Sequence, residues 1–412
     1  MKRVAFAGAS SRGATMYAEP FAREFRDKVA LVGVYDINPK RSQVLKNRTG
    51  QDFKVYTDFD VMLRDARPDV VVVTTVDRFH HEYIIRSLEY GCDVITEKPM
   101  TIDGDKCSAI LEAEARTGRK VIVTFNCRFM PFAARIKELM KAGAVGTPLS
   151  VHFEWLLDTS HGADYFRRWH RCKENSGGLL VHKATHHFDL VNWFLEERPV
   201  AVSAFGTLRY YGPGGPFRGE RCRGCMHTAK CEFYWDIAAD ALAKEFYLDC
   251  EDADGYYRDR CVFAQDINIE DSVSASVQYD GGTVMSYSLT AHSPYEGYRL
   301  VINGAGGRLE AEDIHTGIGV FANQQIYRLR LYNRKGEEME IRMPNVTGIH
   351  GGGDARLRRM LLDDALPDPL GQMAGSLDGA YSILIGIAAN FSIKEGRMVR
   401  LDELLRTPAT RG

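Results

Sequence analysis

A glycine-containing turn near the N-terminus has the residue types of a phosphate-binding loop. An apolar run at 4–9 leads into the segment GASSRG, and a helical pattern follows. Glycines in such a turn let the backbone approach a pyrophosphate, and the amides that begin the helix favour its charge. The spacing departs from G-x-G-x-x-G around the middle glycine, so a purely structural turn is an equal alternative for this segment alone. The predicted cofactor contacts are Gly8, Ser10, Ser11, Arg12 and Gly13.

A carboxylate follows the second apolar run. Asp36 lies about 20 residues beyond the loop, where a carboxylate accepts hydrogen bonds from adenosine ribose hydroxyls and repels a 2′-phosphate. This favours NAD over NADP. Lys40 and Arg41 come soon after and could accept that phosphate instead. Asp36 could also cap the helix that starts near Pro39, and the two roles are compatible.

The nine cysteines fall into two groups. Some are scattered singly, as is typical of reduced thiols, and the others gather in a segment at about 210–266. Within that segment a C-x2-C-x5-C step and a later cysteine predict a thiolate metal site with a structural role, for which zinc fits better than an iron–sulfur cluster. Unliganded cysteines or disulfides remain the alternative. The predicted ligands are Cys222, Cys225, Cys231 and Cys261.

Two histidines four residues apart offer another metal hypothesis. His182 and His186 would lie on one face of a helix, as a pair of metal ligands does. A catalytic zinc would need a third ligand, for which Glu154 or His292 are the candidates. We give this alternative less weight than a proton-transfer role for the same histidines.

Short apolar runs must position these residues. In residues 1–122 the runs at 4–9, 31–36, 70–75, 93–98 and 120–125 alternate with helical patterns, which predicts a doubly wound parallel sheet with helices on both faces. This would be the NAD-binding domain.

Residues 123–412 have a different pattern of apolar and polar residues. Alternating strands at 149–155, 272–279, 282–290 and 298–304 predict a large open, mainly antiparallel sheet in an α+β domain that binds substrate and forms oligomers. The cysteine-rich insertion interrupts this domain at about 210–266, and helices at 355–366 and 376–396 close the chain.

The composition indicates which classes of binding partner to expect. The 53 Lys and Arg residues nearly balance the 55 Asp and Glu residues, which gives no reason to expect nucleic acid or an anionic membrane. The N-terminal apolar run is too short for a signal peptide, and the longest apolar stretches, at 70–76 and 383–389, are too short to span a bilayer. We therefore expect a cytoplasmic protein with a small substrate.

The order of several segments resembles the glucose-fructose oxidoreductase and inositol dehydrogenase family, often written Gfo/Idh/MocA. These segments are the glycine loop with Asp36, Thr74-Thr75 leading to His80, Glu97-Lys98-Pro99, Asn126-Cys127-Arg128-Phe129, and residues 177–189. The resemblance covers nearly the whole chain, and its most specific element is Glu97-Lys98-Pro99. It implies a Rossmann domain, an open sheet that covers the nicotinamide, and a homodimer or homotetramer formed through that sheet.

The resemblance also assigns roles. Lys98 and His186 would handle the proton that accompanies hydride transfer, and His182 replaces the aspartate of the family pattern and joins the acid–base candidates. Further cofactor contacts are Thr74, Thr75, His80, Glu97, Lys98 and Asn126. The substrate contacts are Arg128, Tyr165, Arg168, Trp169, Lys183 and His186.

The implied reaction is reversible oxidation of a secondary alcohol on a sugar, cyclitol or glycoside, with C3 of a pyranoside as the first carbon considered. Two alternatives stay open. One is an NAD-dependent glycosidase that oxidises its substrate transiently and lets the glycosidic bond eliminate. The other is a non-catalytic NAD-binding protein on the same fold.

Overall fold

The computed structural model describes residues 1–317, 326–343, 349–363 and 365–405. Its first sheet has seven strands in the order β15-β6-β5-β4-β1-β2-β3, and all pairs are parallel except the short edge strand β15. The strand order reverses between β1 and β4, which is where doubly wound sheets bind ligands. The strands are β1 (Lys2–Ala7), β2 (Val29–Tyr35), β3 (Lys54–Tyr56), β4 (Val70–Val73), β5 (Asp93–Thr96), β6 (Val121–Val123) and β15 (Ala374–Gly375).

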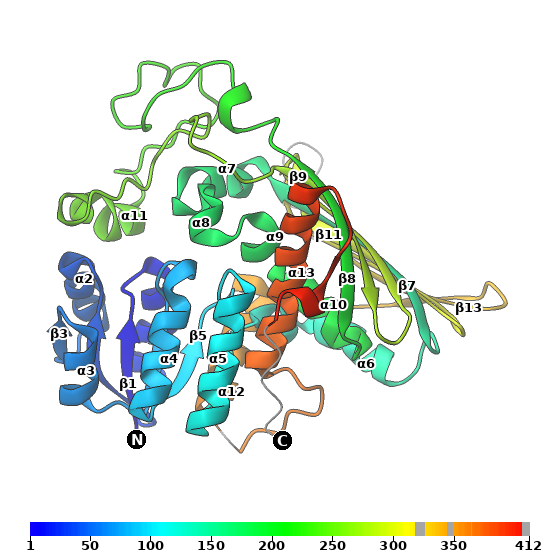
Figure 1. Ribbon diagram of the computed structural model, residues 1–412, viewed down its shortest axis with the longest axis horizontal. Coiled ribbons are helices and arrows are strands. Elements are labelled where there is room, and N and C mark those ends of the chain that lie inside the picture. Colours follow the sequence, from blue (N-terminus) through cyan, green and yellow to red (C-terminus); the bar gives the residue numbers. More distant parts are fainter. Residues whose placement is uncertain (318–325, 344–348, 364, 406–412) are drawn as a thin grey trace.

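Helices flank this sheet on both sides, as predicted (Figure 1). Each residue of β4 is buried, because such strands are covered on both faces. Asn38, not Asp36, caps the helix that begins at Pro39, since its side chain accepts from the amides of Lys40 and Arg41. The helices are η1 (Gly13–Ala18), α1 (Glu19–Arg23), α2 (Pro39–Thr49), α3 (Phe59–Ala66), η2 (Asp77–Phe79), α4 (His80–Tyr90) and α5 (Gly104–Thr117).

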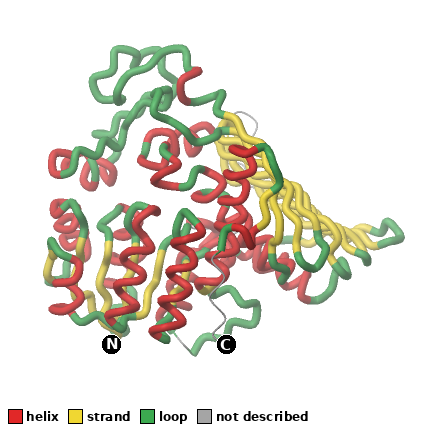
Figure 2. The backbone as a smooth tube through the Cα atoms, in the orientation of Figure 1, coloured by secondary structure: helices red, strands yellow, loops and turns green. Residues whose placement is uncertain are grey.

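The second sheet has nine strands in the order β14-β13-β12-β11-β7-β10-β9-β8-β16. It is mainly antiparallel, as predicted, with β7 and β10 as its parallel pair. Buried and exposed residues alternate along β9, so one face packs against helices and the other lies open (Figure 2). The strands are β7 (Pro148–Asp158), β8 (Pro199–Thr207), β9 (Ser272–Tyr279), β10 (Val284–Ser293), β11 (Tyr295–Gly304), β12 (Gly307–Gly317), β13 (Ile326–Asn333), β14 (Glu338–Ile341) and β16 (Val399–Arg400).

Helix α12 (Gly353–Leu362) packs against the first domain, and helices such as α9, α10 and α13 cover one face of the second sheet. The expected domain boundary at residue 122 falls inside β6, and β15 returns from the closing segment to the first sheet. The closing helices are α12 (Gly353–Leu362) and α13 (Ser376–Glu395). Residue 364 of the predicted 355–366 helix lies outside the described residues. The helices after β6, apart from those of the insertion, are η3 (Asn126–Phe129), α6 (Pro131–Lys141), α7 (Thr159–Arg167), η4 (Trp169–Arg171), α8 (Lys173–Ser176), α9 (Leu179–His182), α10 (Thr185–Leu195), η8 (Ile349–Gly352), α12 (Gly353–Leu362), α13 (Ser376–Glu395) and η9 (Leu401–Glu403).

Helix α13 is long and apolar enough to cross a bilayer by length and composition alone. However, 67% of its most apolar window is buried inside the protein. It packs against β8, α9 and α10 as the central helix between the two sheets (Figure 1).

The insertion arches over the first domain. It contains η5 (Gly212–Gly214), α11 (Ala241–Phe246) and η6 (Leu248–Ala253), and Figure 1 shows α11 above α2. Phe246 is fully buried in the same apolar cluster as Phe6 of β1. The insertion of the second domain is thus part of the wall of the nucleotide-binding domain.

Candidate active site

Lys98 lies just beyond β5, at the carboxyl edge of the first sheet. Its ammonium nitrogen is 3.0 Å from the His182 carbonyl oxygen and 3.3 Å from His182 Nε2. Burial lowers the pKa of Lys98 to about 8, although the carboxylates of Asp77 and Glu97 oppose this shift. A lysine with such a pKa can both accept and donate a proton near neutral pH.

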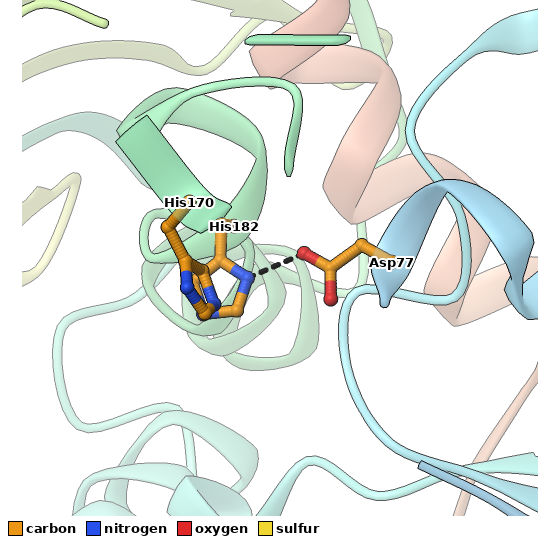
Figure 3. A group of neighbouring side chains, drawn as sticks. All are labelled: Asp77, His170 and His182. Carbon is orange, nitrogen blue, oxygen red and sulfur yellow. Dashed lines mark hydrogen bonds and ion pairs between the residues drawn. The ribbon is translucent and has the colours of Figure 1, made fainter. Parts of the chain in front are cut away.

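Asp77 and His182 are buried beside Lys98, and Figure 3 shows Asp77 with His182 and His170. Asp77 Oδ2 lies 2.5 Å from His182 Nδ1. Burial raises the pKa of the Asp77 carboxyl and lowers the pKa of the His182 imidazole. The two side chains are joined by a hydrogen bond. Asp77 is not among the site residues predicted from the sequence, although its position just after β4, at the same sheet edge as Lys98, could have indicated it.

Aromatic side chains surround His182. Trp169 stacks on His170 at a centroid distance of 3.5 Å, and the rings of Tyr165 and His170 lie 5.6 Å and 4.1 Å from that of His182. Two predicted substrate contacts, Tyr165 and Trp169, are therefore brought to the acid–base group. Arg168 is near them, with its guanidinium 5.1 Å above the Tyr165 ring and 3.0 Å from Asp164.

The hypothesis that His182 and His186 bind a metal together with Glu154 or His292 is wrong. His182 ends α9 and His186 lies in α10, so the two do not share one continuous helix. Glu154 pairs with Arg299, and His292 bonds Ser272, both on the second sheet.

Asp77, His170 and His182 have ligand atoms close enough together to resemble a metal site. Among the described residues, they are the only three whose ligand atoms lie within 4.8 Å of one another. Two ligands of one ion lie roughly 3 Å apart or more, because each bond is about 2 Å long. The contact between Asp77 Oδ2 and His182 Nδ1 is therefore a hydrogen bond and too short for two ligands of one ion.

His186 lies at the start of α10 and is buried. Its ring lies edge-on to that of Phe125 at a centroid distance of 5.9 Å. Lys98 contacts His182, the histidine that replaces the aspartate of the family pattern.

Lys183 belongs to a neighbouring polar group that the sequence analysis did not identify. Its ammonium is 3.8 Å from Glu296, which also bonds His161 at 2.8 Å. His161 in turn contacts the Tyr165 hydroxyl at 3.2 Å. Burial opposes ionisation of Glu296, yet its bonds to His161 and the charge of Lys183 lower its pKa to about 2. A charged carboxylate thus lies beside the aromatic side chains.

The prediction that Arg128 binds substrate is wrong. Its guanidinium is buried and donates two hydrogen bonds to Asp189, at 2.8 Å and 2.6 Å, and one to Asp378. The third nitrogen donates to the Gly371 carbonyl. Arg128 therefore anchors η3 to α10 and α13, and Asp189 has a packing role.

Arg12, Glu97 and Asn126 form a network beneath the cofactor loop. Arg12 bonds Glu97 and Asp354, each at 2.8 Å, and Asn126 donates to Asp354 at 2.6 Å. Tyr17 donates to the same Glu97 oxygen that Arg12 contacts. These hydrogen bonds hold α12 against the first domain, whereas Asn126 Oδ1 is buried without a hydrogen-bond partner among the described residues.

The glycine loop has the geometry that a dinucleotide requires. Gly8 has φ +97°, and a Cβ there would lie 2.7 Å from the Thr74 backbone, so the loop needs glycine to pack on β4. Asp36 follows β2 and accepts from the amides of Ala9 and Asn38, each at 2.7 Å, which leaves further carboxylate lone pairs for a ribose. The helix start, the switch point and Asp36 together fit NAD.

Three predicted cofactor contacts have specific protein partners. The amide and hydroxyl of Ser11 bond the Tyr247 hydroxyl of the insertion, at 3.3 Å and 2.9 Å. Thr74 donates its hydroxyl to the Gly8 carbonyl. His80 is buried with both ring nitrogens on the carbonyls of Thr75 and Pro99, which indicates that it shapes the turn and does not present a polar atom to the cofactor.

The insertion brings its cysteines together. Phe217, Phe233 and four cysteines line one cavity, which we call the cysteine pocket. All nine cysteines of the chain are free thiols, so the disulfide alternative is not observed. Cys250 lies elsewhere in the insertion, where its carbonyl accepts from Asn38 at 2.8 Å. The cysteines of the pocket are Cys222, Cys225, Cys231 and Cys261.

Comparison with known proteins agrees with this architecture. The profile described as "Oxidoreductase family, NAD-binding Rossmann fold" matches residues 2–125, and "Oxidoreductase family, C-terminal alpha/beta domain" matches residues 137–401. The protein YteT of Bacillus subtilis is 39% identical, with 98% of this chain and 99% of YteT covered. The inositol 2-dehydrogenase of Rubrobacter xylanophilus is 29% identical over 40% of this chain and 45% of its own length. A crystal structure of an Agrobacterium radiobacter oxidoreductase with NAD+, L-tartaric acid and magnesium shares the fold, with a TM-score of 0.67, 14% identity, and 98% and 99% of the two chains covered. This chain therefore belongs to the Gfo/Idh/MocA family of NAD-binding oxidoreductases.

Proposed function

We propose that this protein is an NAD-dependent dehydrogenase that moves a hydride to or from a secondary alcohol of a sugar, cyclitol or glycoside. The observation that carries the proposal is the contact between Lys98 and His182, which places two acid–base groups from two domains side by side. C3 of a pyranoside is the carbon that we would test first.

The side chains around Lys98 suit this reaction. Bound NAD supplies the hydride acceptor at the carboxyl edge of the first sheet. Lys98 takes the hydroxyl proton as the alcohol becomes a ketone, and returns it in the reverse reaction. His182, held by Asp77, orients the lysine and is the next carrier of that proton. The rings of Tyr165 and Trp169 offer apolar faces to a polyol, while Lys183 and Glu296 offer groups for its hydroxyls.

Variants of the acid–base group test the proposal. Lys98→Met should lower single-turnover reduction of NAD by about 10²- to 10⁴-fold and leave NAD binding intact. His182→Ala and His186→Ala tell which histidine handles the proton, and we expect the larger loss at His182. Lys120→Met, an exposed lysine at the start of β6, is the matched control. Near-normal turnover by Lys98→Met would overturn the assignment.

The products decide between the dehydrogenase and its alternatives. Net NADH formation on a free sugar or cyclitol supports the dehydrogenase. Turnover of a glycoside without net NADH would indicate transient oxidation and elimination. A non-catalytic NAD-binding protein would bind the nucleotide and turn over neither class of substrate.

We propose in addition that the cysteine pocket holds a metal centre through its four thiolates. Thiolates are ligands for zinc, the ion that the sequence predicts, and for iron. Its role is structural, because the pocket belongs to the insertion and not to the acid–base group.

Assembly and location are also proposals. The open face of the second sheet is the surface through which we propose a homodimer or homotetramer, since an uncovered sheet face favours association. The thiol state of all nine cysteines is in keeping with a cytoplasmic protein. Light scattering and fractionation of cells test these two points.

A further inference from the structure

We infer that the cysteine pocket holds a [4Fe–4S] cluster and not a zinc ion. The inference rests on the metal centre proposed above and identifies it. It does not depend on the proposed dehydrogenase activity.

The first observation is the spacing of the sulfur atoms. A tetrahedral zinc with bonds of about 2.3 Å holds its four sulfurs roughly 3.8 Å apart. Among the described residues, only Asp77, His170 and His182 have three ligand atoms that all lie within 4.8 Å of one another. No three sulfurs of the cysteine pocket are therefore that close together. A cubane cluster binds each thiolate to a different iron and so needs a wider set of sulfurs.

The second observation is the apolar lining of the cysteine pocket. Its walls include the rings of Phe217 and Phe233, and Cys222 is only 8% exposed. Apolar walls keep solvent away from an iron–sulfur centre and tune its reduction potential.

The third observation is the set of donors aimed at the sulfurs. The amides of Gly219 and Phe263 both donate to Cys261 Sγ at 3.5 Å, and the His227 amide donates to Cys225 Sγ at 3.4 Å. The Arg167 guanidinium lies 3.1 Å from Cys222 Sγ. Four thiolates around an iron–sulfur core carry net negative charge, which these donors and the buried cation stabilise.

Gly219 shows that the backbone approaches the pocket closely. A Cβ at this position would lie 3.0 Å from Cys225 Sγ, tighter than ordinary contact. The glycine lets its amide reach Cys261 while the chain passes Cys225. The same segment therefore contacts two of the four ligands.

Metal and sulfide analysis of the intact protein, purified without oxygen or chelator, tests the inference. We expect about four iron and four acid-labile sulfide ions per chain, with broad visible absorption that dithionite bleaches. One zinc per chain without sulfide would overturn the cluster and keep the metal centre. Protein without metal or sulfide would overturn both. Because no variant is needed, a folding failure cannot obscure these outcomes.

Two variants locate the cluster. Cys225→Ser should lose most of the iron and sulfide, whereas Cys172→Ser, a cysteine outside the pocket, should keep both. Full iron and sulfide content in Cys225→Ser would overturn the placement. Hydride transfer is measured separately, so failure of the dehydrogenase proposal remains distinguishable.

Discussion

Asp77 and His182 lie 2.5 Å apart across the boundary between the two domains. Asp77 comes from η2 after β4, and His182 ends α9 of the second domain. Where the resemblance leads one to expect an aspartate at position 182, the chain has an imidazole, and the carboxylate approaches from the opposite domain. The proton-carrying set is thus completed only when both domains are in place.

Replacing Asp77 by Asn should shift the pH dependence of alcohol oxidation. Lys98 must be unprotonated to accept the hydroxyl proton, so oxidation should rise with pH through about 8, the pKa of Lys98. The Asp77 charge raises the pKa of Lys98 against the effect of burial, so its removal should move this rise to lower pH. The measurement is single-turnover oxidation from pH 6 to 10.

A purely structural role for Asp77 makes a different prediction. Loss of packing would lower the rate at every pH and leave the midpoint unchanged. The reduction direction gives an internal check, because it requires protonated Lys98 and should fall as pH rises through the same midpoint. A midpoint in Asp77→Asn equal to that of the unaltered protein would contradict the positioning role.

Carboxylates of the insertion should strengthen the preference for NAD over NADP. Lys40 pairs with Asp252 at 2.7 Å, and Arg41 pairs with Asp254 and Asp36. The two cations that could accept a 2′-phosphate therefore both have carboxylate partners in the insertion. Asp252→Asn combined with Asp254→Asn should improve NADP affinity relative to NAD by at least about tenfold, because like charges would no longer face the phosphate.

Nucleotide titration of the double variant measures this preference without any substrate. Asp249→Asn is the matched control, since Asp249 lies in the same segment but pairs with Lys244. Asp36→Ala should also weaken the preference, as this carboxylate faces the ribose site. An unchanged ratio of the two affinities in the double variant would show that the insertion plays no part in selection.

Local patterns were sufficient to predict the first sheet and the alternation of the second. The runs at 70–75 and 272–279 correspond to β4 and β9. A strand buried on both faces is apolar throughout, and a strand buried on one face alternates apolar and polar residues. The four cysteines of one pocket were also predictable from spacing. The partners of Arg128 and Lys40 were not, because Asp189 and Asp252 lie 61 and 212 residues away and only the tertiary fold brings them together.

Arg128→Met should destabilise the protein without changing substrate affinity. The variant leaves Asp189 buried without its cation, a loss of about 3–5 kcal/mol in the free energy of unfolding. Denaturant unfolding measures the loss, and combination with Asp189→Leu should recover part of it, since no buried charge then remains. A raised KM with normal stability would instead restore Arg128 to the substrate site.

Arg221 should connect the cysteine pocket to nucleotide binding. It bonds Glu251 of η6 and Asp259, each at 2.8 Å, and the Asp259 carbonyl accepts from the amide of Cys222. Helix η6 also presents the Cys250 carbonyl that Asn38 bonds beside Asp36. Arg221→Met leaves the fully buried Asp259 without its cation and should loosen this contact, so NAD affinity should fall by about tenfold. Titration with NAD and the metal content are measured on the same sample, with Arg218→Met, an exposed neighbour, as the control. Full NAD affinity in Arg221→Met would mean that the pocket stabilises the insertion alone, whereas loss of affinity with metal retained would place the effect in the η6 contact.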